Sequence, residues 1–120
     1  MGFIKVRFGV FNPLKPDRVL ELEGVVDTGA IYTVLPTNLM KELGVKPISK
    51  RRFRLANNQV IERDVGLIGI EIKGVKTYTT VVFGDENIYL LGVVTLEELG
   101  LEVDPVKGEL KPMELLLMRC

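Results

Sequence analysis

The sequence contains no histidine, no tryptophan and a single cysteine among its 120 residues. The absence of histidine excludes hydrolase sites in which an imidazole accepts a proton from a serine or cysteine nucleophile. It also removes the commonest zinc ligand, and one cysteine cannot build a thiolate cage for a metal ion. Any acid–base chemistry of this chain must therefore come from carboxylates, lysine or tyrosine.

The chain also lacks an excess of charge, because 16 basic side chains balance 16 acidic ones. Nucleic acids and anionic membranes bind surfaces that are rich in Lys and Arg. One basic cluster stands out, and its members are Lys46, Lys50, Arg51, Arg52 and Arg54. With Phe53 as the one interleaved aromatic residue, we interpret this cluster as a solvated segment and expect no nucleic-acid partner.

Cysteine usage and hydropathy give no sign of secretion or of a membrane. Cys120 is the only thiol, so no intrachain disulfide is possible. No run of about 18 apolar residues exists, and Lys5 and Arg7 interrupt the apolar start where a signal peptide would be unbroken. We expect a soluble, cytoplasmic protein without a membrane partner.

Sixteen valines and eight isoleucines favour strands, and the length suits one domain spanning residues 1–120. Alternation such as that of Ile68, Ile70 and Ile72 with polar or glycine neighbours is typical of half-buried strands. The pattern predicts a mostly β fold. Expected strands lie at residues 4–10, 18–26, 31–35, 52–55, 59–64, 68–72, 75–83 and 88–92, with two or three more after residue 100.

Two short helices are expected between these strands. The first spans residues 38–43, with Thr37 as its N-cap and Gly44 as its stop. The second begins at a capping box formed by Thr95 and Glu98 and ends at Gly100.

Asp27 is the candidate catalytic residue. It directly follows the apolar pair Val25-Val26 and precedes Thr28, Gly29 and Ala30. A carboxylate at the end of a buried strand has few polar neighbours to solvate it. Taken alone, the motif also fits a structural turn in which Asp27 and Thr28 bond their own backbone and Gly29 supplies an unusual φ.

The wider sequence resembles the retropepsin-like aspartic proteases, single-domain relatives of pepsin that include the retroviral proteases and a prokaryotic cellular branch. The first matching element is Val25–Ala30, continued by residues 31–36. The second is Leu90-Leu91-Gly92 followed by a short helix, some sixty residues later. A hairpin near residues 53–63, with its tip at Asn57-Asn58, lies where the family keeps its flap.

This resemblance implies a closed β-barrel of the acid-protease fold and an aspartic endopeptidase that uses no metal and no cofactor. Two carboxylates sharing one proton activate a water molecule in this family, and the chain carries one Asp-Thr-Gly. Asp27 from each subunit of a homodimer would therefore form the catalytic pair. Thr28, Gly29, Ala30, Leu91 and Gly92 would support the active-site loop, and Ala56, Asn57, Asn58 and Gln59 would close over a peptide substrate.

Two departures from the family pattern leave alternatives open. Viral members pair an acidic residue after the alanine with an arginine after the second glycine, and here those positions hold Ile31 and Val93. An apolar contact in place of the ion pair is expected. The flap lacks the multiple glycines of viral enzymes, so a catalytically inactive dimer that binds peptides or partner proteins is the alternative. More distant is a β-rich assembly module in which Asp27 is structural.

The segment at residues 114–118, which contains a Leu-Leu-Leu-Met stretch, has two interpretations. The resemblance assigns them to an intersubunit strand. An ordinary core or edge strand of the same chain is the other possibility.

Overall fold

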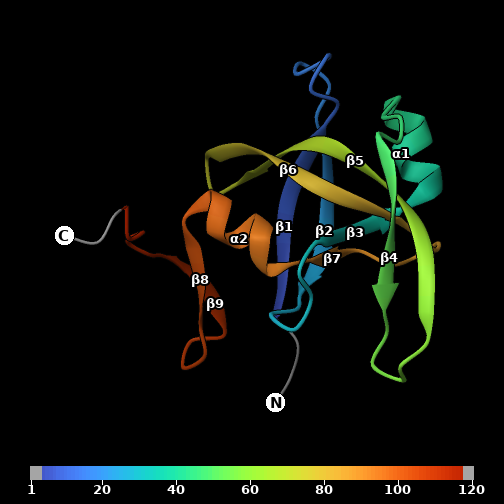
Figure 1. The fold of residues 1–120 in the computed structure, drawn as a ribbon. Helices are drawn as coiled ribbons and strands as arrows, with labels where there is room; N and C mark the ends of the chain where they lie inside the picture. Colours follow the sequence, from blue (N-terminus) through green and yellow to red (C-terminus); the bar gives the residue numbers. More distant parts are fainter. Residues whose placement is uncertain (1–3, 118–120) are drawn as a thin grey trace.

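The computed structural model describes residues 4–117, which form nine strands and two short helices (Figure 1). Met118 and Cys120, considered above, lie outside the described residues. In chain order the elements are β1 (Ile4–Phe11), β2 (Leu20–Val26), β3 (Thr33–Pro36), α1 (Thr37–Leu43), β4 (Ser49–Arg54), β5 (Val60–Ile72), β6 (Val75–Gly84), β7 (Leu90–Leu91), α2 (Val93–Leu99), β8 (Leu101–Asp104) and β9 (Glu109–Pro112).

Six strands close into a barrel. The hydrogen-bonded order is β1-β2-β7-β3-β6-β5, and Gly9, Val10 and Phe11 of β1 pair with β5 to complete the circle. Most neighbours are antiparallel, but β7 runs parallel to β2, and β3 runs parallel to β6. Closure removes free edges from these strands, so all six can present their inner faces to one core.

Strand β5 is longer than expected. The predicted strands at residues 59–64 and 68–72 form one continuous element, because Val65, Gly66 and Leu67 between them pair with β6. The first part of β5 pairs with β4 in a hairpin, and its last part pairs with β1 in the barrel. By contrast, the strand predicted at residues 88–92 is shorter in the structure, where only Leu90 and Leu91 form β7.

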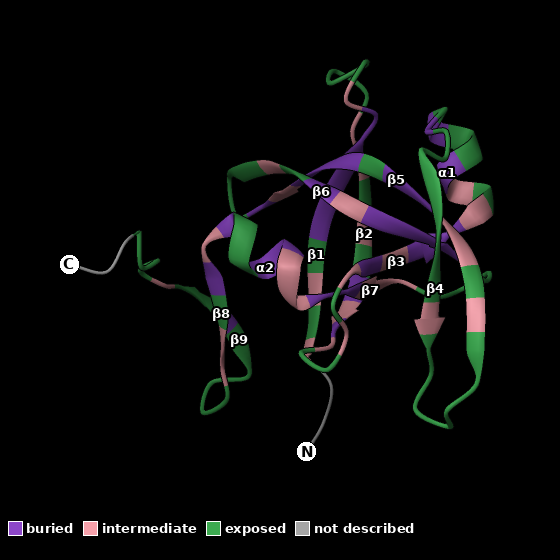
Figure 2. Ribbon diagram, in the orientation of Figure 1, coloured by how far each residue is buried: buried purple, intermediate pink, exposed green. Residues whose placement is uncertain are grey.

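The core fills the barrel and continues beneath α2. Ile68, Ile70 and Ile72 of β5 are all buried, as their alternation predicts. Leu101 of β8 and Leu110 of β9 belong to the same apolar cluster, so the separate two-stranded sheet is attached to the barrel through its core. Figure 2 shows buried residues concentrated on β1, β5 and β6, whereas β4 is largely exposed.

Both helices end where the sequence predicts, at Gly44 and Gly100, which adopt the left-handed conformation. Their starts differ from prediction. Pro36 rather than Thr37 is the N-cap of α1, and the Thr37 hydroxyl donates to the carbonyl of Gly84 at 3.0 Å. Gly92 is the N-cap of α2, so the predicted capping box is wrong.

The β4–β5 hairpin extends from the barrel, and Figure 1 shows its tip at the same end of the molecule as the loop that follows β2. The predicted tip is confirmed, because Asn58 adopts a φ of 69° and its amide donates to the Leu55 carbonyl. The hairpin ladder begins at Ser49, so it is longer than the expected 53–63. Within residues 4–117, no helix has the length and apolar character needed to cross a membrane.

Candidate active site

Asp27 lies at the end of β2, where the chain leaves the barrel. Its amide donates to the carbonyl of Leu91 at 3.0 Å, which extends the parallel β2–β7 pairing by one step. The carbonyl of Asp27 accepts from the amide of Ala30 at 3.1 Å, so the four residues Asp27–Ala30 form a closed turn. The end of a buried strand and a hydrogen-bonded turn therefore fix the backbone on both sides of the carboxylate.

The two oxygens of the Asp27 carboxylate have different surroundings. Oδ1 accepts a hydrogen bond from the Gly29 amide at 2.9 Å. This is the Asx turn that the structural interpretation expects, although Gly29 is not among the residues with positive φ. The other oxygen takes no hydrogen bond from residues 4–117, and the side chain is half-buried. One oxygen is thus held by the loop while the second can meet a water molecule or another carboxylate.

Gly92 lies against the same loop. A Cβ atom at this position would lie 2.4 Å from the carbonyl carbon of Tyr32 and 2.7 Å from the oxygen of Ile31. Real Cβ atoms do not approach backbone atoms so closely, so only glycine fits here. Leu91, fully buried beside it, anchors the segment in the core.

Backbone bonds join the two segments that the sequence separates by some sixty residues. The Val93 amide donates to the Ala30 carbonyl at 2.9 Å, and the Val94 amide donates to the Ile31 carbonyl at 3.0 Å. The Ile31 side chain remains 63% exposed. Main-chain hydrogen bonds therefore join the two segments at Ile31 and Val93, the positions where viral members of the family have an ion pair.

Three threonine hydroxyls lie buried behind this junction, a feature that the sequence interpretation missed. Thr33 and Thr95 share a hydrogen bond of 2.6 Å, and Thr95 and Thr79 share one of 2.8 Å. At the ends of this row, the Gly92 amide donates to Thr33 and Thr79 donates to Glu98. Thr33 lies in β3, Thr79 in β6 and Thr95 in α2, so no pattern within one segment of the sequence reveals the row.

The direction of every bond in the row follows from proton counting. Each hydroxyl has one proton to donate. Since Thr79 donates to the Glu98 carboxylate, Thr95 must donate to Thr79, and Thr33 must donate to Thr95. The chain of donors thus runs from the Gly92 amide to Glu98, which explains why Thr95 and Glu98 do not form a capping box.

Replacing Thr95 with valine is expected to lower the free energy of unfolding by about 1–3 kcal/mol, because the buried Thr33 proton loses its acceptor. Chemical denaturation measures the change. Thr80→Val is the matched control, since Thr80 makes no side-chain hydrogen bond within residues 4–117. An equal effect of the two substitutions would contradict the directed row.

Among the described residues, the hairpin tip at residues 56–59 bonds only to itself and to its own arms. The Leu55 amide donates to the Gln59 carbonyl at 2.8 Å, and the Gln59 amide donates to Asn57 Oδ1 at 3.0 Å. All tip residues are exposed. The structure thus does not bring the predicted tip residues Ala56, Asn57, Asn58 and Gln59 into contact with Asp27.

One side-chain contact does connect the hairpin to the loop of Asp27. Arg51 of β4 donates from Nη1 to the Tyr32 hydroxyl at 2.8 Å, and its guanidinium lies 5.5 Å from the centre of the Tyr32 ring. Phe53, two residues along β4, meets the same ring edge-on at 6.3 Å. We call Tyr32, Arg51 and Phe53 the aromatic–arginine cluster.

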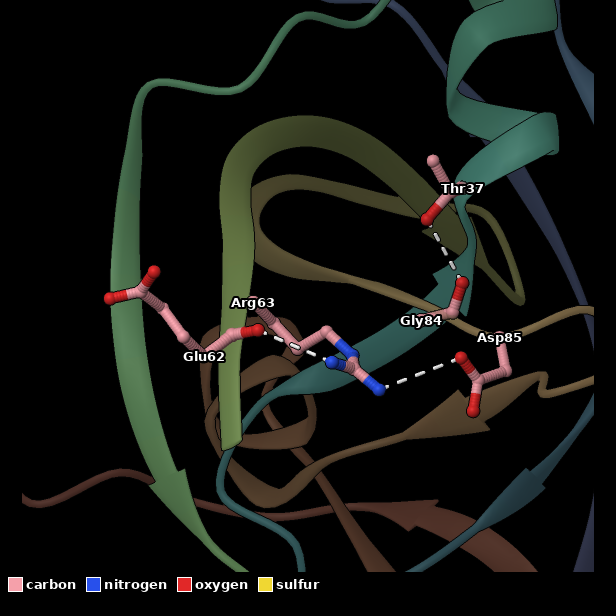
Figure 3. A network of polar contacts seen from close by, with 5 residues as sticks. All are labelled: Thr37, Glu62, Arg63, Gly84 and Asp85. Carbon is pink, nitrogen blue, oxygen red and sulfur yellow. Dashed lines mark hydrogen bonds and ion pairs between the residues drawn. The ribbon is translucent and has the colours of Figure 1, made fainter. Parts of the chain in front are cut away.

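A surface ion pair links β5 of the hairpin to the segment that follows β6 (Figure 3). Arg63 of β5 pairs with Asp85 at 3.6 Å and donates to the carbonyl of Glu62. A hollow of about 320 Å³ opens beside it, lined by charged side chains and by Thr37, Phe83 and Gly84. The base of the hairpin is held because β5 continues into the barrel beside β6, whereas within residues 4–117 the tip carries no bond to the barrel. This arrangement permits motion of the tip.

Among residues 4–117, no three His, Cys, Asp or Glu side chains group closely enough to hold a metal ion. The site consists of a single supported carboxylate, the two segments bonded around it and the hairpin beside them. This arrangement can supply one acid–base group per chain.

Comparison with known proteins identifies both a family and a fold. The model of a family described as gag-polyprotein putative aspartyl protease matches residues 19–98, which include Asp27, the hairpin and Gly92. The solution structure of simian foamy virus (mac) protease has a TM-score of 0.58 with 16% identity, covering 78% of this chain and 91% of that one. No curated protein sequence matches the chain. The predicted mostly β barrel of the acid-protease type is confirmed.

Proposed function

Because the chain belongs to the gag-polyprotein putative aspartyl protease family, we propose that it is an aspartic endopeptidase whose catalytic residue is Asp27. The observation that carries this proposal is the carboxylate itself. One of its oxygens is held by the Gly29 amide, and the other is left without a partner in residues 4–117 at the end of a buried strand. The sequence resemblance to this class of protease is likewise confirmed by the family match.

The proposed mechanism needs two such carboxylates. When they lie close together they cannot both ionise, so the pair holds one proton. The ionised member takes a proton from water as the water oxygen attacks the peptide carbonyl carbon, and the protonated member stabilises the developing negative charge on the carbonyl oxygen. Proton transfer to the leaving nitrogen then breaks the C–N bond and leaves the pair again with one proton.

The chain supplies one carboxylate of this kind, so we propose that a homodimer completes the site. A two-fold axis beside the loop would place the second Asp27 opposite the first. Thr28 and Gly29 are exposed in the single chain, and the Thr28 hydroxyl makes no hydrogen bond within the described residues. Both are therefore accessible to a partner, with Thr28 bonding across the axis and Gly29 presenting its backbone to the peptide.

The C-terminal segment supports the same dimer. Leu115, Leu116 and Leu117 are 58%, 80% and 92% exposed, and the residues after Pro112 form no strand within the described chain. The interpretation as a core or edge strand of the same chain is therefore wrong. An apolar segment left open in one chain is suited to pairing with its symmetry mate.

The hairpin completes the proposal as a flap. Its fixed base and self-contained tip allow Ala56–Gln59 to close over a bound peptide. Closure would exclude water from the site and strengthen the electrostatic interactions inside it.

The dimer is tested by concentration dependence. Specific activity is expected to rise with chain concentration and to reach its plateau where sedimentation gives the mass of a dimer. Leu116→Lys is expected to raise two chain concentrations at least about tenfold: the one that gives half-maximal specific activity and the one at which half of the chains are dimeric. The reason is that each dimer loses two buried leucines. Val106→Lys serves as control, since Val106 is 93% exposed at a loop tip. Full activity of a proven monomer would contradict the shared site.

A further inference from the structure

The aromatic–arginine cluster holds a cation beside the loop of Asp27. Arg51 and Phe53 are two residues apart on β4, so their side chains emerge on the same face and meet Tyr32. The guanidinium lies 5.5 Å from the centre of the Tyr32 ring, within cation–π distance, and also donates to the Tyr32 hydroxyl. An arginine held in this way has lost much of its rotational freedom before any ligand arrives.

The guanidinium retains unused donors. It has five N–H groups, and within residues 4–117 one of them bonds to Tyr32. No carboxylate of the described chain lies within ion-pairing distance of Arg51, whereas Lys50 on the opposite face pairs with Asp64. The remaining fork is the geometry that binds a carboxylate through two parallel hydrogen bonds.

The net positive charge of the hairpin also favours an anionic ligand. Residues 49–65 contain five cationic and two anionic side chains, although the whole chain has no net charge. A cleft flanked by one sign of charge attracts ligands of the opposite sign. The ligand of this face is therefore expected to be anionic.

The cluster lies within reach of a peptide bound at Asp27. Tyr32 follows Asp27 by five residues, which span about 18 Å at most when fully extended, and the Asp27–Ala30 turn shortens that distance. An extended peptide advances roughly 3.3 Å per residue. A side chain a few residues from the cleaved bond can thus meet Arg51.

We propose that Arg51, positioned by Tyr32 and Phe53, is a specificity-determining residue that selects peptides carrying aspartate or glutamate within a few residues of the cleaved bond. The inference rests on the proposed endopeptidase function and adds its substrate class. A nucleic acid would also be attracted by positive charge. It is disfavoured because the two aromatic rings of the cluster already contact each other and Tyr32 also contacts Arg51, so a base stacked on Tyr32 would compete with these contacts.

The test uses the full chain and pairs of peptides that differ at one position, Glu against Gln, scanned across both sides of the cleaved bond. At one position the wild type is expected to cleave the Glu peptide about tenfold faster in kcat/KM, as suits a charge-assisted pair. Arg51→Gln is expected to reduce the Glu/Gln ratio below about twofold, and Arg51→Glu to reverse it in favour of the Gln peptide, because the new carboxylate repels the Glu peptide. Tyr32→Phe keeps the aromatic ring and the charge of Arg51 but removes the hydroxyl that Arg51 binds. This variant is expected to lose part of the preference for Glu over Gln, through a higher KM for the Glu peptide.

Arg52→Gln is the matched control. It removes the same charge from the neighbouring residue, whose side chain lies on the other face of β4. The Glu preference is expected to persist in this variant. Thermal unfolding of all variants shows whether any of them has lost its fold.

Binding separates this inference from the proposed function. The affinities of labelled Glu and Gln peptides are measured by titration into the Asp27→Asn variant, so that binding is observed without cleavage. If the Glu peptide binds preferentially but the wild type cleaves no peptide, the role of Arg51 in selecting acidic peptides is supported and the proposed endopeptidase function is contradicted. Asp27-dependent cleavage with no Glu preference at any position would overturn the selection alone. It would also be overturned if single-stranded RNA binds more tightly than the peptides and loses affinity equally in the Arg51 and Arg52 variants.

Discussion

Asp27→Asn is expected to abolish peptide cleavage and to leave the fold intact. Asparagine has the same shape, and its amide oxygen can still accept the Gly29 hydrogen bond that the carboxylate accepts at 2.9 Å. It cannot hold the shared proton or accept one from water, and general acid–base catalysis typically contributes 10²- to 10⁴-fold to a rate. We expect a loss of at least about 1,000-fold, measured with quenched peptides at pH 4 to 7, with an unchanged unfolding midpoint.

Asp104→Asn provides a matched control for this substitution. Asp104 also caps a turn, because its Oδ1 accepts from the amides of Val106 and Lys107, but it is the last residue of β8, in the separate β8–β9 sheet. Its variant is expected to retain wild-type activity. Cleavage that persists in Asp27→Asn would rule out the assigned residue, and a dimer that binds peptides without cutting them would favour the alternative function. A bell-shaped pH profile of the wild-type rate is expected because the active pair holds one proton.

Gly92→Ala is expected to cause the largest loss of stability. The added methyl group would lie 2.4 Å from the carbonyl carbon of Tyr32. Backbone on both sides is fixed by the Val93 and Val94 hydrogen bonds, so neither segment can yield without breaking them. Overpacking against mobile side chains costs about 1–3 kcal/mol, and against fixed backbone we expect about 3 kcal/mol or more. Any folded fraction should also be inactive, since the Asp27 loop is displaced.

Gly108→Ala separates this overlap from the general cost of replacing glycine. Gly108 adopts a φ of 66°, and no atom of residues 4–117 that could clash lies within 4 Å of an added Cβ. Its variant is expected to lose only about 1 kcal/mol through backbone strain, with activity unchanged. Similar losses in the two variants, measured by urea denaturation, would show that the contact with Tyr32 is not as tight as described.

Local pattern predicted much of the barrel. The alternation of Ile68, Ile70 and Ile72 located one face of β5, since a strand that buries one face must repeat every two residues. Gly44 and Gly100 marked both helix ends because few other residues adopt the left-handed conformation there. The candidate site was found because Asp27 and Gly92 each belong to a short motif, Val25–Ala30 and Leu90-Leu91-Gly92, that resembles a motif of a known family.

Features that depend on distant segments were not predicted. Thr95 looked like a cap because its neighbours suit a capping box, but its hydroxyl bonds to Thr33 and Thr79 across the core. The contact of Arg51 with Tyr32 likewise joins two segments whose separation in space no local pattern reveals. The pairing of β1 with β5, which closes the barrel, belongs to the same group.

The position of β7 has a consequence for biosynthesis. This two-residue strand lies between β2 and β3 in the sheet, yet it is the last barrel strand to be translated. Until Leu90 and Leu91 emerge from the ribosome, β2 has no partner on that side, and the Leu91 carbonyl that holds the Asp27 amide is absent. A nascent chain therefore carries Asp27 in a loop without this support until residues 90–91 have been synthesised, and the proposed active-site loop cannot form before then.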